Sequence, residues 1–560
     1  MKTKPHSLKK RLAALAGALI LAVNCMSLTG CQQNPVVSDN PSSLPSSSAG
    51  PAPTGPAGGL TIRTANSLET VTADFQSEET AVSLSAARHE HESAQILITA
   101  VTGGLVTMEA GDLTGPGTIG AEHIQLRAAV QVDGIPEALV PAASIPVGDG
   151  QRAVVWVTVY VPQDAQPGDY TGSLIFRAGE EEITVPLSLR VADFSLPITP
   201  SIPAAMGIWD VNLRSVYRLS DGDVEELKAV QTDYYNYLLD YRMAPYFFDW
   251  YRPSMKINAY SLPGGLLDES TMALAKDPRM TALMLAYFPF MEDEFREQMQ
   301  LVREEGLLDK SMFYLFDEII TNENVQLVKE NAAAIKAVEP EAHILTTFFT
   351  GPAKPEGNDQ WYDTLDVPQV LRGATDIFCM ATYASSRGDE TVAEKMRQRI
   401  LPGERFWTYV CNRPAGGYPN IFLEKPGFEQ RAVLWRNYAE QATGFLYWSV
   451  NHYNSPRLKP NDESFYIVSE EIPKGDGVLL YDGSMFPEYE YEGIVASVRL
   501  ERLRDSLEDY EYFTLLERTK GKEAAAEIFK KIYVRPTGYM RRFADIEAVR
   551  REIGDLLAGA

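Results

Sequence analysis

Eight apolar, aromatic-rich runs alternate with helical patterns between residues 200 and 450, and no other feature constrains the fold as strongly. Continuous apolar strands, each followed by a helix, are typical of a parallel sheet that is covered on both faces. Eight such units over ~250 residues are the size of a (β/α)8 barrel of the TIM type. A doubly wound open sheet is the second choice, although no Gly-rich phosphate loop follows any run. The runs are 204–209, 245–250, 282–290, 313–316, 343–349, 376–382, 405–410 and 444–450, and the helical patterns between them include 223–239, 292–305, 323–338, 390–400 and 430–442.

The segment before the predicted barrel has a different hydrophobic pattern. Short alternating or apolar runs, separated by Gly, Pro and Asp, continue from residue 60 to about 198 and predict an all-β sandwich. The run from His89 to Glu92 alternates on one of these strands, so His89 and His91 share a face. We interpret the run as a solvated strand face in preference to a metal site, because no third ligand is visible.

A helical extension follows the barrel. A short strand is predicted at 475–481, and helices are predicted at 499–516, 523–532 and 546–557. In the first of these helices Arg504 and Glu508 are four residues apart, which predicts salt bridges on an exposed helix surface. The predicted boundaries are 59–199 for the sandwich, 200–470 for the catalytic barrel and 471–560 for the strand and helical extension.

The N-terminus has the features of an export signal. A basic stretch and an apolar run too short to span a membrane precede Leu28-Thr29-Gly30-Cys31. The order resembles the lipobox of bacterial lipoproteins, so residues 1–30 are expected to be a signal peptide and Cys31 the lipidated residue. Residues 31–58 are rich in Pro, Ser and Gly and read as a tether. We therefore expect a bacterial cell-surface or periplasm-facing protein that meets the membrane only through a lipid anchor.

Composition excludes several classes of partner. A formal net charge of -25 at pH 7 repels nucleic acid and anionic membrane surfaces. After Cys31 only Cys379 and Cys411 remain, so neither a disulfide scaffold nor a cysteine zinc site is expected, and both are interpreted as buried apolar side chains. No metal or organic cofactor and no oligomeric state is predicted.

Active sites of barrels lie at the carboxyl ends of the strands, where this chain gathers aromatic, acidic and amide side chains. The sharpest feature is Asp317-Glu318, which closes the fourth run. Adjacent acids must stay solvated or share a proton, which suits a catalytic pocket, but acids also favour a helix N-terminus. Both interpretations stay open at this point. Aromatic faces stack on sugar rings while carboxylates and amides bind hydroxyls, so the further candidates for substrate binding are Asp249, Tyr383, Tyr409, Asn412, Trp448 and Asn451.

Four segments in this order carry a family resemblance. They are Phe316-Asp317-Glu318, the stretch 407–414, the stretch 444–451, and the stretch 497–512. From about residue 60 to 520 the chain resembles glycoside hydrolase family 123 and the related bacterial domain of unknown function 4091. Ile319 stands where that group usually has Pro, which changes the turn after Glu318 but removes no functional group.

The resemblance implies a β-sandwich followed by a catalytic barrel, and a retaining β-N-acetylgalactosaminidase that uses substrate-assisted catalysis on a 2-acetamido glycan. Together with the lipobox, we expect this enzyme to be surface-anchored. In such an enzyme the acetamido oxygen attacks, Glu318 is the general acid and base, and Asp317 orients the acetamido group. The neighbouring Asp317 is expected to help raise the pKa of Glu318 from ~4.3 towards 6–7. Two alternatives remain: a non-catalytic glycan-binding or scaffold lipoprotein, and a conventional glycosidase pairing Glu318 with a carboxylate such as Asp249.

Overall fold

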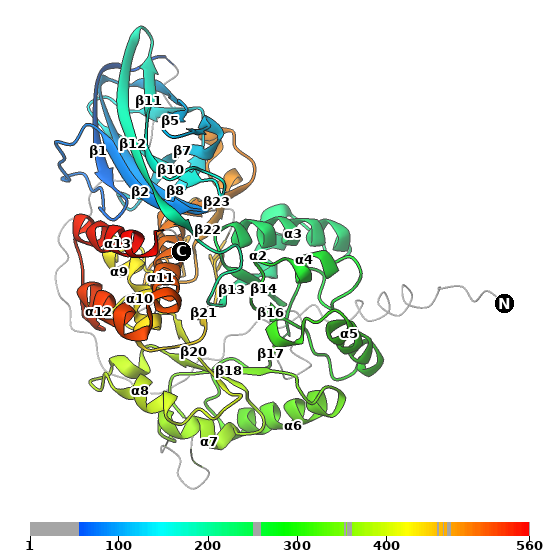
Figure 1. Ribbon diagram of the computed structural model, residues 1–560. Helices are drawn as coiled ribbons and strands as arrows, with labels where there is room; N and C mark the ends of the chain where they lie inside the picture. Colours follow the sequence, from blue (N-terminus) through cyan, green and yellow to red (C-terminus); the bar gives the residue numbers. More distant parts are fainter. Residues whose placement is uncertain are drawn as a thin grey trace, which may run out of the picture. The chain divides into compact units, whose positions relative to one another are not determined.

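The computed structural model describes residues 55–249, 259–351, 354, 361–455, 458–462, 464–467 and 472–558 (Figure 1). The predicted signal peptide, Cys31 and nearly all of the tether lie outside these residues. Within them, no helix combines the length and apolar character needed to cross a membrane.

The first half of the described chain forms two facing antiparallel sheets. The first has the strand order β1-β3-β10-β7-β8-β23-β22 and the second the order β2-β12-β11-β4-β9, with β5 and β6 attached to β11. The only parallel pair in the second sheet is β2 with β12. The strands of this half are β1 (Gly58–Asn66), β2 (Val82–Arg88), β3 (Glu90–Thr102), β4 (Gly104–Ala110), β5 (Leu113–Thr114), β6 (Thr118–Ile119), β7 (Ile124–Val132), β8 (Ile135–Pro141), β9 (Ser144–Val147), β10 (Arg152–Val161), β11 (Gly168–Ala178) and β12 (Glu181–Ser195).

The core of this sandwich follows from residue alternation. In β10, Val155, Val157 and Val159 are fully buried, and they pack against Ile96 and Ile98 of the neighbouring β3. Side chains two apart along a strand share a face, so these residues form one apolar layer between the sheets.

Two strands far away in the sequence complete the first sheet. β23 (Ile494–Ser497) pairs antiparallel with β8, and β22 (Leu480–Asp482) pairs with β23. The strand expected at 475–481 is therefore β22, shifted toward the C-terminus, and it extends the N-terminal sandwich. The chain thus returns to its first domain after completing the second.

The second half forms a nine-stranded sheet that nearly closes into a barrel. Its order is β15-β14-β13-β21-β20-β19-β18-β17-β16, and only β15, antiparallel to β14, departs from parallel pairing. Eight parallel strands remain, and each lies within or overlaps one of the eight predicted apolar runs. They are β13 (Ala204–Trp209), β14 (Ala244–Asp249), β16 (Leu283–Met284), β17 (Ser311–Tyr314), β18 (Ile344–Phe348), β19 (Ile377–Ala381), β20 (Arg405–Val410) and β21 (Phe445–Tyr447), with β15 at Ala259–Ser261.

The expectation of a closed (β/α)8 barrel needs correction. Among the described strands, no ladder joins β14 to β16, and β15 occupies the free edge of β14 instead. β16 is only two residues long, because the apolar run 282–290 leaves the sheet after Met284. Ala286 and Phe288 of that run are buried in a small cluster of their own. The fold is therefore a barrel that stays open between these two strands.

Helices cover the outside of this barrel and connect its strands in turn (Figure 1). Of the predicted patterns, 223–239, 292–305 and 323–338 match helices closely, 390–400 gives a shorter helix, and 430–442 overlaps parts of two helices. The helices are α2 (Asp210–Tyr217), α3 (Val224–Asp240), α4 (Met272–Lys276), α5 (Glu292–Glu304), α6 (Asn322–Val338), α7 (Val367–Leu371), α8 (Val392–Arg397), α9 (Gly427–Arg431) and α10 (Val433–Ala439).

Three C-terminal helices pack where the sandwich meets the barrel: α11 (Val498–Lys520), α12 (Lys522–Ile532) and α13 (Phe543–Leu557). The prediction of an exposed, salt-bridged helix at 499–516 is wrong, because Arg504 and Glu508 are 3% and 1% exposed. Arg504 bonds Glu501 rather than Glu508, at 2.5 Å. α11 is a central helix of the molecule whose charged side chains find partners on other elements.

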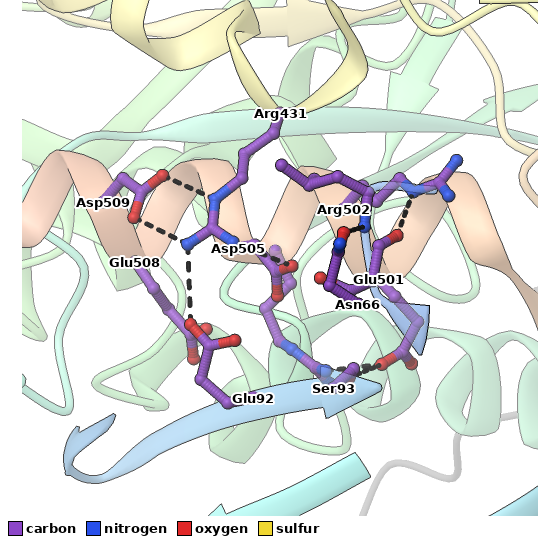
Figure 2. Close-up of polar contacts among 12 residues, drawn as sticks. Asn66, Glu92, Ser93, Arg431, Glu501, Arg502, Asp505, Glu508 and Asp509 are labelled. Carbon is purple, nitrogen blue, oxygen red and sulfur yellow. Dashed lines mark hydrogen bonds and ion pairs between the residues drawn. The ribbon is translucent and has the colours of Figure 1, made fainter. Parts of the chain in front are cut away.

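A buried ion-pair network ties β3 of the sandwich to α9, α11 and α13, and Figure 2 shows part of it. Arg431 of α9 is fully buried, donates to Asp509 at 2.8 and 2.9 Å, and reaches Glu92 of β3 at 3.5 Å. Arg550 of α13 contacts the same two carboxylates and Glu90. The expected solvated face at residues 89–92 is therefore corrected for Glu90 and Glu92, which are buried and bind arginines.

Candidate active site

Asp317 and Glu318 lie in the loop between β17 and α6, at the carboxyl end of the barrel. The strand ends at Tyr314, and α6 begins at Asn322 with Thr321 as its cap, whose hydroxyl accepts the N–H of Asn324. The pair therefore precedes the first turn of the helix. A role in stabilising the helix N-terminus, the alternative left open by the sequence, does not fit this position.

The backbone bends at Glu318, whose φ is +45°. A non-glycine residue rarely adopts this left-handed conformation, and such strain concentrates at functional sites. The Glu318 N–H donates to the hydroxyl of Thr347 on β18 at 2.9 Å, and the next residue, Ile319, is fully buried. These two contacts hold the bend, which leaves Asp317 exposed and Glu318 half-buried.

Two hydroxyls fix the carboxylate of Asp317. Tyr314 donates to Oδ1 at 2.6 Å and Thr347 donates to the same oxygen at 3.0 Å. The ring of Tyr314 stacks on Tyr260 with centroids 4.1 Å apart, so the donor is itself rigidly placed. Within the described part of the chain, Oδ2 of Asp317 accepts no hydrogen bond and remains available to a ligand.

Glu318 is bound by Tyr409, whose hydroxyl donates to Oε1 at 2.5 Å. β20, which carries Tyr409, is three strands away from β17 in the sheet, so this bond crosses the end of the barrel. Burial chiefly, and the charge of Asp317 second, raise the pKa of Glu318 to about 7, while the Tyr409 bond opposes that rise. The expected rise is confirmed, with burial as its larger cause. A carboxyl group that titrates near neutrality can both donate and accept a proton.

An aromatic cluster lies at the carboxyl ends of the neighbouring strands β13 and β21, formed by Trp209, Trp448 and His452. Trp448 meets Trp209 edge to face at 6.2 Å and meets His452 at 4.8 Å. The buried Asp476 fixes Trp448 by accepting from its indole N–H at 3.2 Å and from the Tyr447 hydroxyl at 3.0 Å. Burial raises the pKa of Asp476 to about 6. Trp448 is half-buried.

The other predicted binding residues differ in their surroundings. Asn451 is 1% exposed and uses both ends of its amide on the backbone of Trp209, at 2.8 and 3.2 Å, so it positions that residue. Tyr383 is half-buried after β19, with Arg387 over its ring at 5.5 Å. Asn412 is half-buried after β20, where Oδ1 accepts from the Cys411 thiol at 3.1 Å. The side chain of Asp249, at the end of β14, lies outside the described part.

Three residues of this site were missed by the sequence analysis: Tyr314, Thr347 and Asp476. Tyr314 stands three residues before Asp317, a spacing that could have signalled a contact, whereas Thr347 and Asp476 approach only through the fold. Cys379 is buried as expected, but Cys411 is only half-buried. Its thiol pKa is raised by burial and by the nearby carboxylates of Asp476 and Glu318. The described residues contain no cluster of His, Cys, Asp and Glu side chains that could hold a metal ion.

Comparisons with known proteins bear on the fold and on the domain that contains these residues. A search of curated proteins finds no match to the chain. A family 123 glycoside hydrolase from Clostridium perfringens has a similar structure, with a TM-score of 0.64, 13% identity, and coverage of 89% of this chain and 98% of that one. At this low identity, the structural similarity shows a shared fold and nothing more.

Two further structures show much weaker similarity. They are a putative β-galactosidase from Bacteroides fragilis (TM-score 0.26, 10% identity, covering 72% of this chain and 59% of that chain) and a β-glucuronidase from Parabacteroides merdae (TM-score 0.25, 8% identity, covering 72% and 51%). A comparison of the sequence with family models gives a further match. Residues 259–516, which include Asp317, Glu318, Tyr409 and Trp448, match the model of the glycoside hydrolase 123 catalytic domain.

Proposed function

We propose that the protein is a retaining glycoside hydrolase that cleaves β-linked 2-acetamido sugars, β-N-acetylgalactosaminides first among them, with assistance from the substrate. One observation carries the proposal. A carboxyl group with a pKa of about 7, Glu318, stands beside a second carboxylate, Asp317, which two hydroxyls orient. The match of residues 259–516 to the model of the glycoside hydrolase 123 catalytic domain and the fold shared with a family 123 hydrolase support it.

In this mechanism Glu318 is protonated when the substrate arrives and gives its proton to the glycosidic oxygen. The Tyr409 bond occupies Oε1, so Oε2 is the oxygen free to transfer the proton. The acetamido oxygen of the sugar attacks the anomeric carbon as the leaving group departs. Glu318 then takes a proton from the water that opens the cyclic intermediate, so that configuration is retained.

Asp317 has the second role. Its Oδ1 is held by Tyr314 and Thr347, whereas Oδ2 can accept the N–H of the acetamido group. This bond turns the acetamido oxygen toward the anomeric carbon, and the negative charge steadies the positive oxazolinium-like intermediate. The aromatic rings of Trp448 and Trp209 offer a face for the sugar ring. Tyr383 and Asn412 are proposed to contact the glycan farther from the bond that breaks.

The test compares Glu318→Gln with wild type on an aryl β-N-acetylgalactosaminide. The variant should lose ~10²–10⁴-fold in kcat/KM because it has no proton to give. Glu323→Gln is the matched control, since Glu323 is an exposed glutamate in the first turn of α6. Near-wild-type hydrolysis by Glu318→Gln would remove Glu318 from its role. Binding without hydrolysis by the wild type would identify a glycan-binding protein instead.

A second variant tests the assistance by the substrate. Asp317→Asn should impair aryl β-N-acetylgalactosaminides far more than aryl β-galactosides, which have no acetamido group to orient. Equal hydrolysis of both substrates by the wild type would instead favour the conventional mechanism with two protein carboxylates, for which Asp249 is the candidate partner.

We also propose that the enzyme is anchored by lipid at Cys31 on the outer side of a bacterial membrane. The support is the resemblance of residues 1–31 to a lipoprotein signal. Replacing Cys31 with Ser should release the protein from the membrane fraction, and persistence there would contradict the anchor.

A further inference from the structure

A cavity of about 310 Å³ lies between the sandwich and the barrel, away from Asp317 and Glu318. Its barrel side includes Arg242, which precedes β14, and Ile198, which precedes β13. Residues before parallel strands gather at the amino ends, opposite the carboxyl ends that hold the candidate active site. The volume falls in the range of small-molecule sites. This cavity is therefore a separate place at which a ligand can bind.

Tyr160 of β10 forms the aromatic part of the wall. Its ring lies 4.7 Å from that of His91 and 6.1 Å from that of His89, both also in the lining. The Tyr160 hydroxyl has no hydrogen-bond partner among the described residues, and the side chain is half-buried. The wall thus offers ring surface together with a free hydroxyl.

The lining also includes Glu508 of α11, one of the residues drawn in Figure 2. Its Oε1 accepts the N–H of His91 at 3.1 Å, but its Oε2 has no partner in the described structure, although the side chain is 1% exposed. The same holds for the Nε atoms of Arg242 and Arg504, whose side chains are 7% and 4% exposed. Because these three atoms are themselves buried, they lie behind the surface that a ligand in the cavity would touch.

The charges of the lining argue against an anion as the occupant. Arg242 pairs with Glu511 at 3.4 Å, and Arg504 pairs with Glu501 at 2.5 Å. The third arginine, Arg279, pairs with Asp277 at 2.7 Å and also with Asp240. Each arginine of the lining already has a carboxylate, so no excess of positive charge faces the cavity.

We propose that this cavity is a second, non-catalytic binding site for one neutral sugar unit of a glycan. A pyranose has hydroxyls that donate and accept, a C–H face that packs on an aromatic ring, and no charge. These properties match the free Tyr160 hydroxyl, the tyrosine and histidine rings, and the balanced charges of the wall. The site does not depend on the proposed hydrolase activity. It would hold a glycan chain at the opposite end of the barrel from the cleavage point.

The test is binding of four methyl β-glycosides, of glucose, galactose, N-acetylglucosamine and N-acetylgalactosamine, to the full chain by saturation-transfer NMR titration. At least one should bind to wild type and to Glu318→Gln. Its affinity should fall at least tenfold in Tyr160→Ala and in Gln125→Trp, which adds bulk at an exposed lining position on β7. The matched control is Gln131→Trp, on the same strand and also exposed but outside the lining.

Hydrolysis of an aryl β-N-acetylgalactosaminide is measured on the same samples and should be unchanged in Tyr160→Ala and Gln125→Trp. If none of the four glycosides binds to the wild type, or if binding persists undiminished in both lining variants, the second site is refuted. Loss of activity in Glu318→Gln alone reports on the proposed function and leaves this outcome separate.

Discussion

The hydrogen bond from Tyr409 to Glu318 predicts how the activity should depend on pH when the bond is removed. The bond stabilises the ionised form of Glu318 and so opposes the rise in pKa caused by burial and by Asp317. A hydrogen bond to a charged group contributes about 1.5–3 kcal/mol. At 1.36 kcal/mol for each pKa unit, its removal in Tyr409→Phe should raise the pKa of Glu318 from about 7 by roughly 1–2.

The assay is kcat/KM against pH on an aryl β-N-acetylgalactosaminide. Its basic limb reports the group that must be protonated in the free enzyme. In the wild type this limb should lie near pH 7, and in Tyr409→Phe it should move to roughly pH 8–9. Tyr383→Phe, whose hydroxyl makes no bond to Glu318 in the described structure, should leave it in place. A limb that stays fixed in Tyr409→Phe, or moves to lower pH, would refute Glu318 as the acid that this bond tunes.

Two further predictions concern the buried network. Arg431→Leu should lower the free energy of unfolding, measured by urea titration, by about 3–5 kcal/mol, because Asp509 is left buried with fewer partners. The control is Arg296→Leu, at an exposed pair with Glu292, which should lower it by less than about 1 kcal/mol. Equal losses would contradict this account. Burial raises the pKa of Glu547 from 4.5 to about 8, so its contribution to stability, present below pH 4.5, is lost as pH rises through about 8. Tm should therefore fall over this range, and less steeply in Glu547→Gln; parallel curves would show that Glu547 does not titrate there.

The barrel strands could be predicted because their residues are apolar on both faces, a pattern that few other elements produce. The sequence could not show where an apolar run stops being a strand. In 282–290, only Leu283 and Met284 pair with β17, and Phe288 is buried without joining the sheet. Burial and strand pairing both favour apolar residues, so hydrophobicity alone does not separate them.

The charged helix α11 shows a different reason for failure. Arg504 and Glu508 are spaced as an exposed pair would be, and the prediction of a solvated helix follows from that spacing. The partners that allow burial lie on distant parts of the chain: Glu508 receives the N–H of His91, and Arg431 reaches Asp509. A buried charge can be recognised only when its partner is known, and here the partner is up to 417 residues away.

The pair Asp317-Glu318 was visible because two acids end one run, but its geometry depends on the neighbouring strand. Successive residues of an extended strand face opposite sides, so Asp317 and Glu318 can serve one site only if the chain leaves the extended conformation. The positive φ of Glu318 provides that change. Its energetic cost is offset by one hydroxyl, that of Thr347, which accepts the N–H of Glu318 and donates to Oδ1 of Asp317. Because Thr347 lies on β18, the pairing of β17 with β18 orients both acids, and the barrel rather than the loop sets their positions.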